Sequence, residues 1–172
     1  MNGFLLFIPI FLIRYGVLYV LDKEAFKRAA FFPPPMGREK VAFWIYQIST
    51  AIMVAYMLFL SVKTKSVWFY AGVAVYCAGI VLCAVSTINY ARPSENGMNL
   101  KGLYRVSRNP MYIAYFICFL GCALLTESLI MFALLTVFQA SAHWIILSEE
   151  RWCISRFGNE YIQYMKKVRR YI

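Results

Sequence analysis

Apolar residues occur along the chain in five long runs that are separated by shorter polar connections. The runs cover residues 4–21, 41–62, 67–89, 111–125 and 129–147. Most are close to the roughly 20 residues that a helix needs to cross a bilayer, and only the fourth is clearly shorter. The pattern predicts an all-α fold, an integral membrane helical bundle with about five transmembrane helices.

Composition supports this prediction. The chain has 172 residues, of which 62% are hydrophobic and 15% are charged. Soluble domains have roughly 45–50% apolar and about 25% charged residues. We expect a single membrane domain over residues 1–172. Its first part, residues 1–96, would hold N-terminal transmembrane helices, and residues 97–172 would hold the polar motifs described below.

The net charge of +10 is distributed unevenly. Fifteen of the eighteen Lys and Arg residues lie in the connections 22–40 and 90–110 and in the tail after residue 147, whereas the connection 63–66 holds two. Such residues collect in cytoplasmic loops and meet anionic lipids. We therefore expect contacts with membrane lipids and none with nucleic acid. The predicted orientation is N-terminus outside and C-terminus cytosolic, which in a prokaryote means the cytoplasmic membrane.

The last two apolar runs are joined by three residues, so they are expected to form an antiparallel hairpin. This hairpin returns Glu149 and Glu150 to the membrane face that holds Arg105 and Arg108. Charged residues beside a membrane core usually have a function. The sequence thus predicts a polar site at the cytosolic ends of the hairpin.

Glu149 and Glu150 are unusual because we expect them to end a helix, where the helix dipole disfavours carboxylates. No basic residue stands four positions before or after them, so compensation must come from elsewhere in the bundle or from a cationic or hydroxyl-rich ligand. We favour Glu150 as the functional residue, because Gln139, His143 and Glu150 form one polar stripe. The alternative is that Glu149 and Glu150 are solvated at the level of the lipid headgroups and have no function.

His143 is the only histidine of the chain, which excludes any multi-histidine metal centre. The five cysteines lie mainly inside apolar runs, where they act as small hydrophobic residues, and we expect no metal. Alone, His143 is more often a hydrogen-bonded core histidine than a catalyst. Its position on the stripe also suits a pocket lining.

Asn109 and Pro110 are typical of a helix start, with Asn as the cap and Pro in the first turn. Free helix N–H groups beside arginines would form an anion site for a carboxylate or phosphate. Arg14 lies within the first apolar run. It either snorkels or pairs with a neighbouring helix, or it has a function.

Taken together, these residues resemble the membrane methyltransferases typified by isoprenylcysteine carboxyl methyltransferase, with phosphatidylethanolamine N-methyltransferase as a more distant relative. The shared pattern reads G-x-[YF]-x-x-x-R-[HN]-P-x-Y, then a hairpin, then E-E, then F-G-x-[ED]-Y-x-x-Y. The matching residues here are Gly102, Tyr104, Arg108, Asn109, Pro110, Tyr112, Glu149, Glu150, Phe157, Gly158, Glu160, Tyr161 and Tyr164.

The resemblance implies that S-adenosylmethionine is the methyl donor. It implies that Glu149 or Glu150 holds the ribose hydroxyls or the amino group of the donor, and that Arg108 lies near the acceptor or the methionine carboxylate. Asn109 replaces the histidine of the eukaryotic enzymes, as in bacterial-type members. The implied lining of the cofactor pocket is Lys101, Gly102, Tyr104, Asn109, Pro110 and Tyr112.

The expected reaction is methyl transfer to a lipophilic, membrane-embedded acceptor, with the carboxylate of a prenylcysteine-like group as the type case. A carboxylate acceptor needs no base, whereas an amine, thiol or phenol would use His143 or Glu150. The predicted catalytic residues are Arg108, His143 and Glu150. The alternatives are a small membrane transporter and a non-enzymatic subunit of a membrane complex. A transporter would place polar residues near the midplanes of several helices and often show repeats.

Overall fold

The N-terminal helix opens the fold in this computed structural model, which describes residues 1–172. It runs over Gly3–Leu21 and contains a π-helical turn, η2, at Leu12–Val17. Its other segments are η1 (Gly3–Leu6), α1 (Phe7–Phe11) and α2 (Leu18–Leu21). The short helix α3 (Lys23–Ala30) follows, and the Asp22 side chain caps it by accepting a hydrogen bond from the Glu24 N–H at 2.9 Å.

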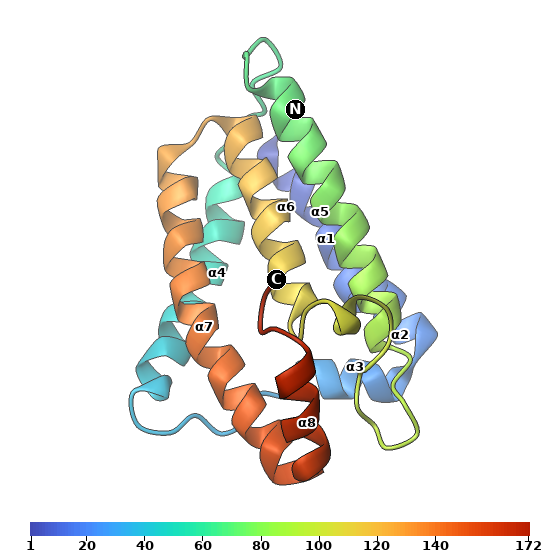
Figure 1. Ribbon diagram of the computed structural model, residues 1–172. Helices are drawn as coiled ribbons and strands as arrows, with labels where there is room; N and C mark the ends of the chain where they lie inside the picture. Colours follow the sequence, from blue (N-terminus) through green and yellow to red (C-terminus); the bar gives the residue numbers. More distant parts are fainter.

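Four longer helices complete a bundle that contains no strand. They are α4 (Glu39–Met57), α5 (Phe69–Tyr90), α6 (Pro110–Thr126) and α7 (Leu129–Phe157). Two short helices, η3 (Gly102–Arg105) and α8 (Asn159–Lys167), precede α6 and follow α7. In Figure 1 the long helices run in a common direction, and α3 and α8 lie at the end away from the connection between α4 and α5. The predicted all-α helical bundle is confirmed.

Glycines allow α5 and α6 to pack closely. A Cβ atom on Gly79 would lie 2.6 Å from the Cys118 backbone nitrogen, and one on Gly121 would lie 2.6 Å from the Tyr76 backbone nitrogen. Small residues at such positions let two helix backbones approach each other within a membrane, where packing replaces the hydrophobic driving force. This contact fixes the position of α6, whose first turn contributes to the polar site.

The apolar core lies between the N-terminal helix and α4–α7, mainly toward the end with the α4–α5 connection. Met53, Met57, Met131 and Leu135 are fully buried there. The ring of Phe138 stacks on Tyr46 with centroids 5.0 Å apart. The opposite end of α6 and α7 is therefore left for polar residues.

Three helices are long and apolar enough to cross a membrane by length and composition. They are Gly3–Leu21, Phe69–Tyr90 and Leu129–Phe157. Helix α6 is apolar but shorter, as its sequence predicts, and α4 begins with two charged residues. The connections rich in Lys and Arg all lie at the end of the bundle that holds α3 and α8 (Figure 1). These features indicate an integral membrane protein; the orientation stays a prediction.

The second helix is shorter than the apolar run that contains it. We expected it to reach residue 62, but α4 ends at Met57. The start of the chain pairs with the residues that follow: the Asn2 side-chain amide donates to the Leu58 carbonyl at 2.8 Å, and the Gly3 N–H donates to the Leu60 carbonyl at 2.7 Å. These hydrogen bonds hold the last residues of the run in a turn.

The last long helix continues well beyond the apolar run. No helix-breaking residue follows residue 147 until Gly158, whose φ of +58° ends α7. The prediction that Glu149 and Glu150 end a helix is therefore wrong. Both lie inside α7, so the repulsion from the helix terminus, which is confined to about the last turn, does not apply to them.

Candidate functional site

Glu150 lies at the centre of a buried cluster of charges. Its Oε1 atom accepts hydrogen bonds from Arg108 Nη2 at 2.7 Å and Nε at 3.0 Å, and its Oε2 atom accepts one from Arg170 Nη2 at 2.7 Å. The side chains of Arg108 and Glu150 are 7% and 5% exposed. One carboxylate thus pairs with two guanidinium groups through charge-assisted hydrogen bonds, and the three groups together keep one net positive charge.

Arg108 also donates hydrogen bonds to backbone carbonyls of the protein. Its Nη1 atom donates to the carbonyls of Met165 at 3.1 Å and Val168 at 2.7 Å, which belong to the end of α8 and the residue after it. The guanidinium therefore joins α7, α8 and the loop before α6. Glu150 is thus the anion beside Arg108 in the structure. The predicted contact of Arg108 with the acceptor or the methionine carboxylate stays a prediction.

Glu149 has a different environment from its neighbour. Its Oε1 atom accepts a hydrogen bond of 2.8 Å from the Tyr112 hydroxyl, which comes from the first turn of α6. The Tyr46 ring of α4 lies edge-on to Tyr112 with centroids 6.5 Å apart. Tyr112 is the only protein group that hydrogen-bonds this carboxylate, so its second oxygen is available to a ligand.

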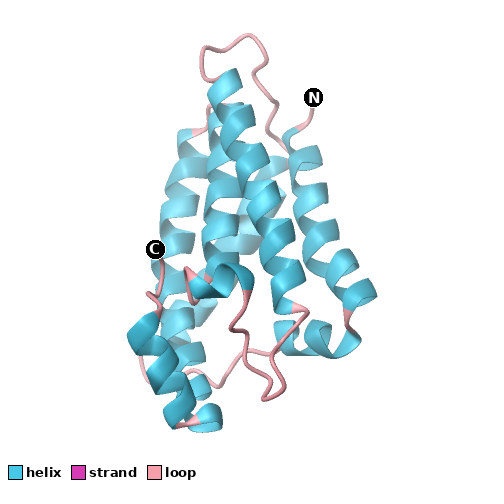
Figure 2. Ribbon diagram, turned by 45° about the vertical axis from the view of Figure 1, so that its right-hand side comes forward, coloured by secondary structure: helices cyan, strands magenta, loops and turns pink.

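The last five residues, 168–172, form a C-terminal arm that returns along the site. The Arg108 N–H donates to the Arg169 carbonyl at 2.9 Å, and the Asn109 side-chain amide donates to the Arg170 carbonyl at 3.1 Å. At the tip of the arm, the Tyr171 hydroxyl lies 2.7 Å from His143 Nδ1. Figures 1 and 2 show the C-terminus about halfway along the bundle rather than at its end.

The predicted helix start at Asn109 and Pro110 is only partly correct. Pro110 is the first residue of α6, as expected, but the Asn109 side chain makes no capping hydrogen bond. Its amide is turned toward the C-terminal arm instead. The Ser107 hydroxyl accepts the Asn109 N–H at 3.1 Å, so this serine stabilises the turn before the helix.

The loop before α6 has a fixed shape that depends on Gly102. Gly102 has a φ of +60°, and a Cβ atom there would lie 1.8 Å from the Asn89 Oδ1 atom. That oxygen accepts the Leu103 N–H at 2.8 Å, so Asn89 anchors the start of η3. Lys101, which precedes the glycine, has an exposed side chain.

Tyrosines join this loop to α8. Tyr104 is buried, and its carbonyl accepts a hydrogen bond of 2.6 Å from the Tyr164 hydroxyl. Burial raises the pKa of Tyr164 to about 12, so the phenol stays protonated and keeps its donor. Glu160 accepts a hydrogen bond of 2.9 Å from Asn96 in the same loop. The second half of the sequence pattern therefore packs against the first half.

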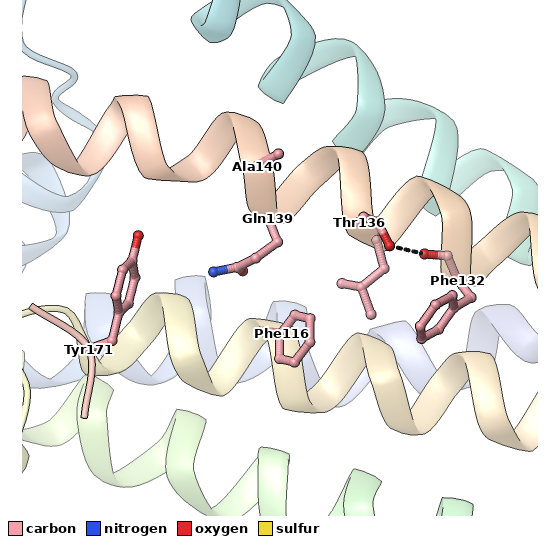
Figure 3. A pocket seen from close by; sticks show the side chains of 7 residues that line it. Phe116, Phe132, Thr136, Gln139, Ala140 and Tyr171 are labelled. Atoms are coloured by element: carbon pink, nitrogen blue, oxygen red, sulfur yellow. Dashed lines mark hydrogen bonds between the residues drawn. The ribbon is translucent and has the colours of Figure 1, made fainter.

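A groove lies between α6 and α7 above the charged cluster. It has a volume of about 430 Å³. Figure 3 shows Gln139 on its lining and Tyr171 at one end. The lining residues are Phe116, Phe132, Leu135, Thr136, Gln139, Ala140 and Tyr171. The predicted polar stripe is thus divided: Gln139 lines the groove, His143 contacts it through Tyr171, and Glu150 belongs to the charged cluster.

Arg14 reaches toward the same end of the bundle. Its Nη2 atom donates to the Ala29 carbonyl of α3 at 2.8 Å, and its Nη1 atom lies 3.0 Å from the Met111 sulfur. This is the interpretation in which the side chain snorkels and pairs with a neighbouring helix. Arg14 joins the N-terminal helix to α3 and α6.

Comparison with known proteins identifies the family. Residues 67–160, more than half of the chain, match the phospholipid methyltransferase family. The chain belongs to this family. The phospholipid methyltransferase family includes the isoprenylcysteine carboxyl methyltransferases, so the resemblance drawn from the motifs is confirmed at the level of the family. No curated protein and no solved structure matches the chain.

Membership of the phospholipid methyltransferase family indicates a membrane methyltransferase. The matched segment starts before α5 and ends at Glu160, so it contains Gly102, Arg108 and both glutamates. The C-terminal arm lies outside it. The site therefore combines elements of the family with an arm whose contacts come from the last residues of this chain.

Sequence reasoning did not identify Arg170, Tyr171 and Asn89 as parts of the site. The absence of a basic residue four positions before or after Glu150 indicated a distant partner, and the basic run at the C-terminus offered one. Nothing in the residue pattern showed that the chain would turn back after α8 and bring Arg170 to Glu150.

Proposed function

We propose that this protein transfers a methyl group from S-adenosylmethionine to a lipophilic acceptor embedded in the membrane. The proposed acceptor is the carboxylate of a prenylcysteine-like group, as expected for a bacterial-type member related to isoprenylcysteine carboxyl methyltransferase. The family supports methyl transfer in general. The donor and the acceptor are our proposals.

The pairing of Glu149 with Tyr112 between α6 and α7 carries this proposal. A carboxylate with one free oxygen suits the ammonium group or the ribose hydroxyls of the donor through charge-assisted hydrogen bonds. The adjacent rings of Tyr112 and Tyr46 suit a cation such as a sulfonium. In the loop before η3, Asn99 has a buried side-chain oxygen without a hydrogen-bond partner, which suits an N–H donor such as an amino group.

The contacts support different roles for the two glutamates. We assign donor binding to Glu149, because Tyr112 leaves it an open oxygen. We assign a positioning role to Glu150 and Arg108, since both groups already make their hydrogen bonds within the protein. The remaining predicted donor contacts, from Lys101 to Pro110, then come from the loop that these residues hold in place.

The proposed reaction requires the protein mainly to position the donor and the acceptor and to exclude water from them. The donor, when bound, supplies a methyl group that its positive sulfur has already activated. The residues around Glu149 orient the reacting groups, and the apolar groove excludes water. A carboxylate acceptor needs no base. His143, held through Nδ1 by Tyr171, is the candidate base for an amine acceptor.

The test is methyl transfer by the purified protein with radiolabelled donor. We compare an N-acyl S-farnesylcysteine with the S-methyl analogue, which has the same carboxylate but no lipid chain. The expected result is labelling of the farnesylated acceptor alone, with loss of labelling in Glu149→Gln. Equal labelling of both acceptors would contradict a membrane acceptor, and no labelling of any lipophilic acceptor would contradict the proposed transfer.

A further inference from the structure

Gln139 places an unpaired polar atom inside the apolar groove. Its side-chain Oε1 atom is buried and has no hydrogen-bond partner. Burying an amide oxygen without a hydrogen-bond partner is unfavourable, and hydrocarbon surroundings offer no water to satisfy it. A ligand in the groove that carries a hydrogen-bond donor would remove this cost.

The other polar side chains of the groove are already satisfied. The Thr136 hydroxyl donates to the Phe132 carbonyl at 3.0 Å, and the Tyr171 hydroxyl is engaged with His143 Nδ1 at 2.7 Å. Figure 3 shows Gln139 projecting from α7 toward Phe116 and Tyr171, away from the hydrogen bond of Thr136. Gln139 is therefore the polar side chain of the groove lining whose oxygen has no hydrogen-bond partner.

We propose that the groove binds the acceptor and that Gln139 selects acceptors whose polar end carries an N–H or O–H group. The chemical class is a single-chain alkyl or isoprenoid amphiphile with a secondary amide, amine or hydroxyl beside its chain. This inference rests on the proposed function, because it adds an acceptor requirement to the same site.

The dimensions and the position of the groove fit this class of ligand. Its volume of about 430 Å³ lies within the roughly 300–1,000 Å³ of small-molecule sites. Gln139 lies one helical turn, about 6 Å along the axis, from His143, which contacts Tyr171 of the C-terminal arm. Phe132, Leu135 and Phe116 line the groove with apolar surface, which suits the chain of the ligand.

The test uses two isomeric probes, N-farnesylpropionamide and N-methyl-N-farnesylacetamide. Both have the same atoms and the same lipid chain, but only the first has an amide N–H. Binding of each to the full-length protein in detergent micelles is measured with radiolabelled probe. The wild-type protein should prefer the first probe by about fivefold, the worth of one hydrogen bond of average strength.

Variants assign this preference to Gln139. Gln139→Leu keeps the size of the side chain but removes its amide, and it should bind both probes within about twofold. Thr136→Val, which alters a groove hydroxyl that is already satisfied, should keep the preference. A wild-type protein without preference, or a Gln139→Leu variant that retains it, would overturn the inference. Gln139→Met serves in the same way if the leucine variant does not fold.

The same samples separate this inference from the proposed function. S-adenosylhomocysteine binds at the Glu149 end in our proposal, so Gln139→Leu should bind it as tightly as the wild-type protein. Absence of S-adenosylhomocysteine binding in the wild-type protein contradicts the proposed function, whatever the probes show. Normal binding without probe preference contradicts only the role of Gln139.

Discussion

Glu149 and Glu150 are adjacent in sequence but differ in every contact. Glu150 shares its carboxylate between Arg108 and Arg170 in a buried cluster, whereas Glu149 accepts one hydrogen bond from the neutral Tyr112 hydroxyl. From the sequence, both carboxylates were expected to be compensated elsewhere in the bundle or by a ligand. In the structure, arginines compensate Glu150, whereas Glu149 has no basic partner.

Glu150→Gln should destabilise the ligand-free protein by about 3 kcal/mol, because it leaves the buried Arg108 without its counter-ion. Glu149→Gln should change the free energy of unfolding by less than about 1 kcal/mol, since an amide oxygen can still accept from Tyr112. Denaturant unfolding in detergent measures both. Equal stability of the two variants would show that the Arg108–Glu150 pair contributes nothing to the fold.

At the scale of elements, α5 and α6 approach each other closely at glycines. Gly79→Val would place side-chain atoms where the backbone of Cys118 lies, so it should destabilise the bundle by about 1–3 kcal/mol. Gly16→Ala is the matched control, because nothing lies within 4 Å of a Cβ atom there. Thermal unfolding of the two variants should separate them. A Gly79→Val protein as stable as the control would contradict the close packing.

The elements also show how far the sequence could predict the fold. Apolar runs predicted the helices, because burial in lipid dominates their formation. They did not predict where α4 ends, since the hydrogen bonds of Asn2 and Gly3 with residues 58–60 join segments far apart in the chain. Helix α7 ends at Gly158, a glycine with positive φ, although the apolar run ends at residue 147. The hydropathy pattern therefore placed the end of this helix too early.

The sequence predicted which residues gather at the site, but not how they pair. The motifs indicated which residues gather, and the hairpin indicated that they meet at one end of the bundle. The assignment of partners was not predictable: Glu150 was favoured as the donor ligand because of its stripe, yet Arg170 of the C-terminal arm occupies it. The return of the arm depends on contacts with Arg108 and Asn109 that no local pattern encodes.

At the scale of the whole molecule, charge separates the two ends of the bundle. The connections with most of the Lys and Arg residues lie beside α3 and α8, and the connection between α4 and α5 lies at the other end (Figure 1). The positive-inside rule then predicts that the charged end and the site face the cytosol.

Reporter fusions test this orientation. A reporter after Ile172 should be cytosolic, and one inserted at residues 63–66 should be on the other side of the membrane. An insertion at residues 94–97, in the loop before η3, serves as the control and should report the same side as the C-terminus. A cytosolic signal from residues 63–66 would reverse the predicted topology.

The central claim is that the charged end binds S-adenosylmethionine through Glu149, and calorimetric titration with S-adenosylhomocysteine tests it most directly. The wild-type protein and Glu95→Gln, a change at an exposed loop carboxylate, should bind equally well. Glu149→Gln should lose about 1.5–3 kcal/mol of binding free energy, the range for a hydrogen bond to a charged group. Unchanged affinity in Glu149→Gln, or no binding by the wild-type protein, would contradict the account.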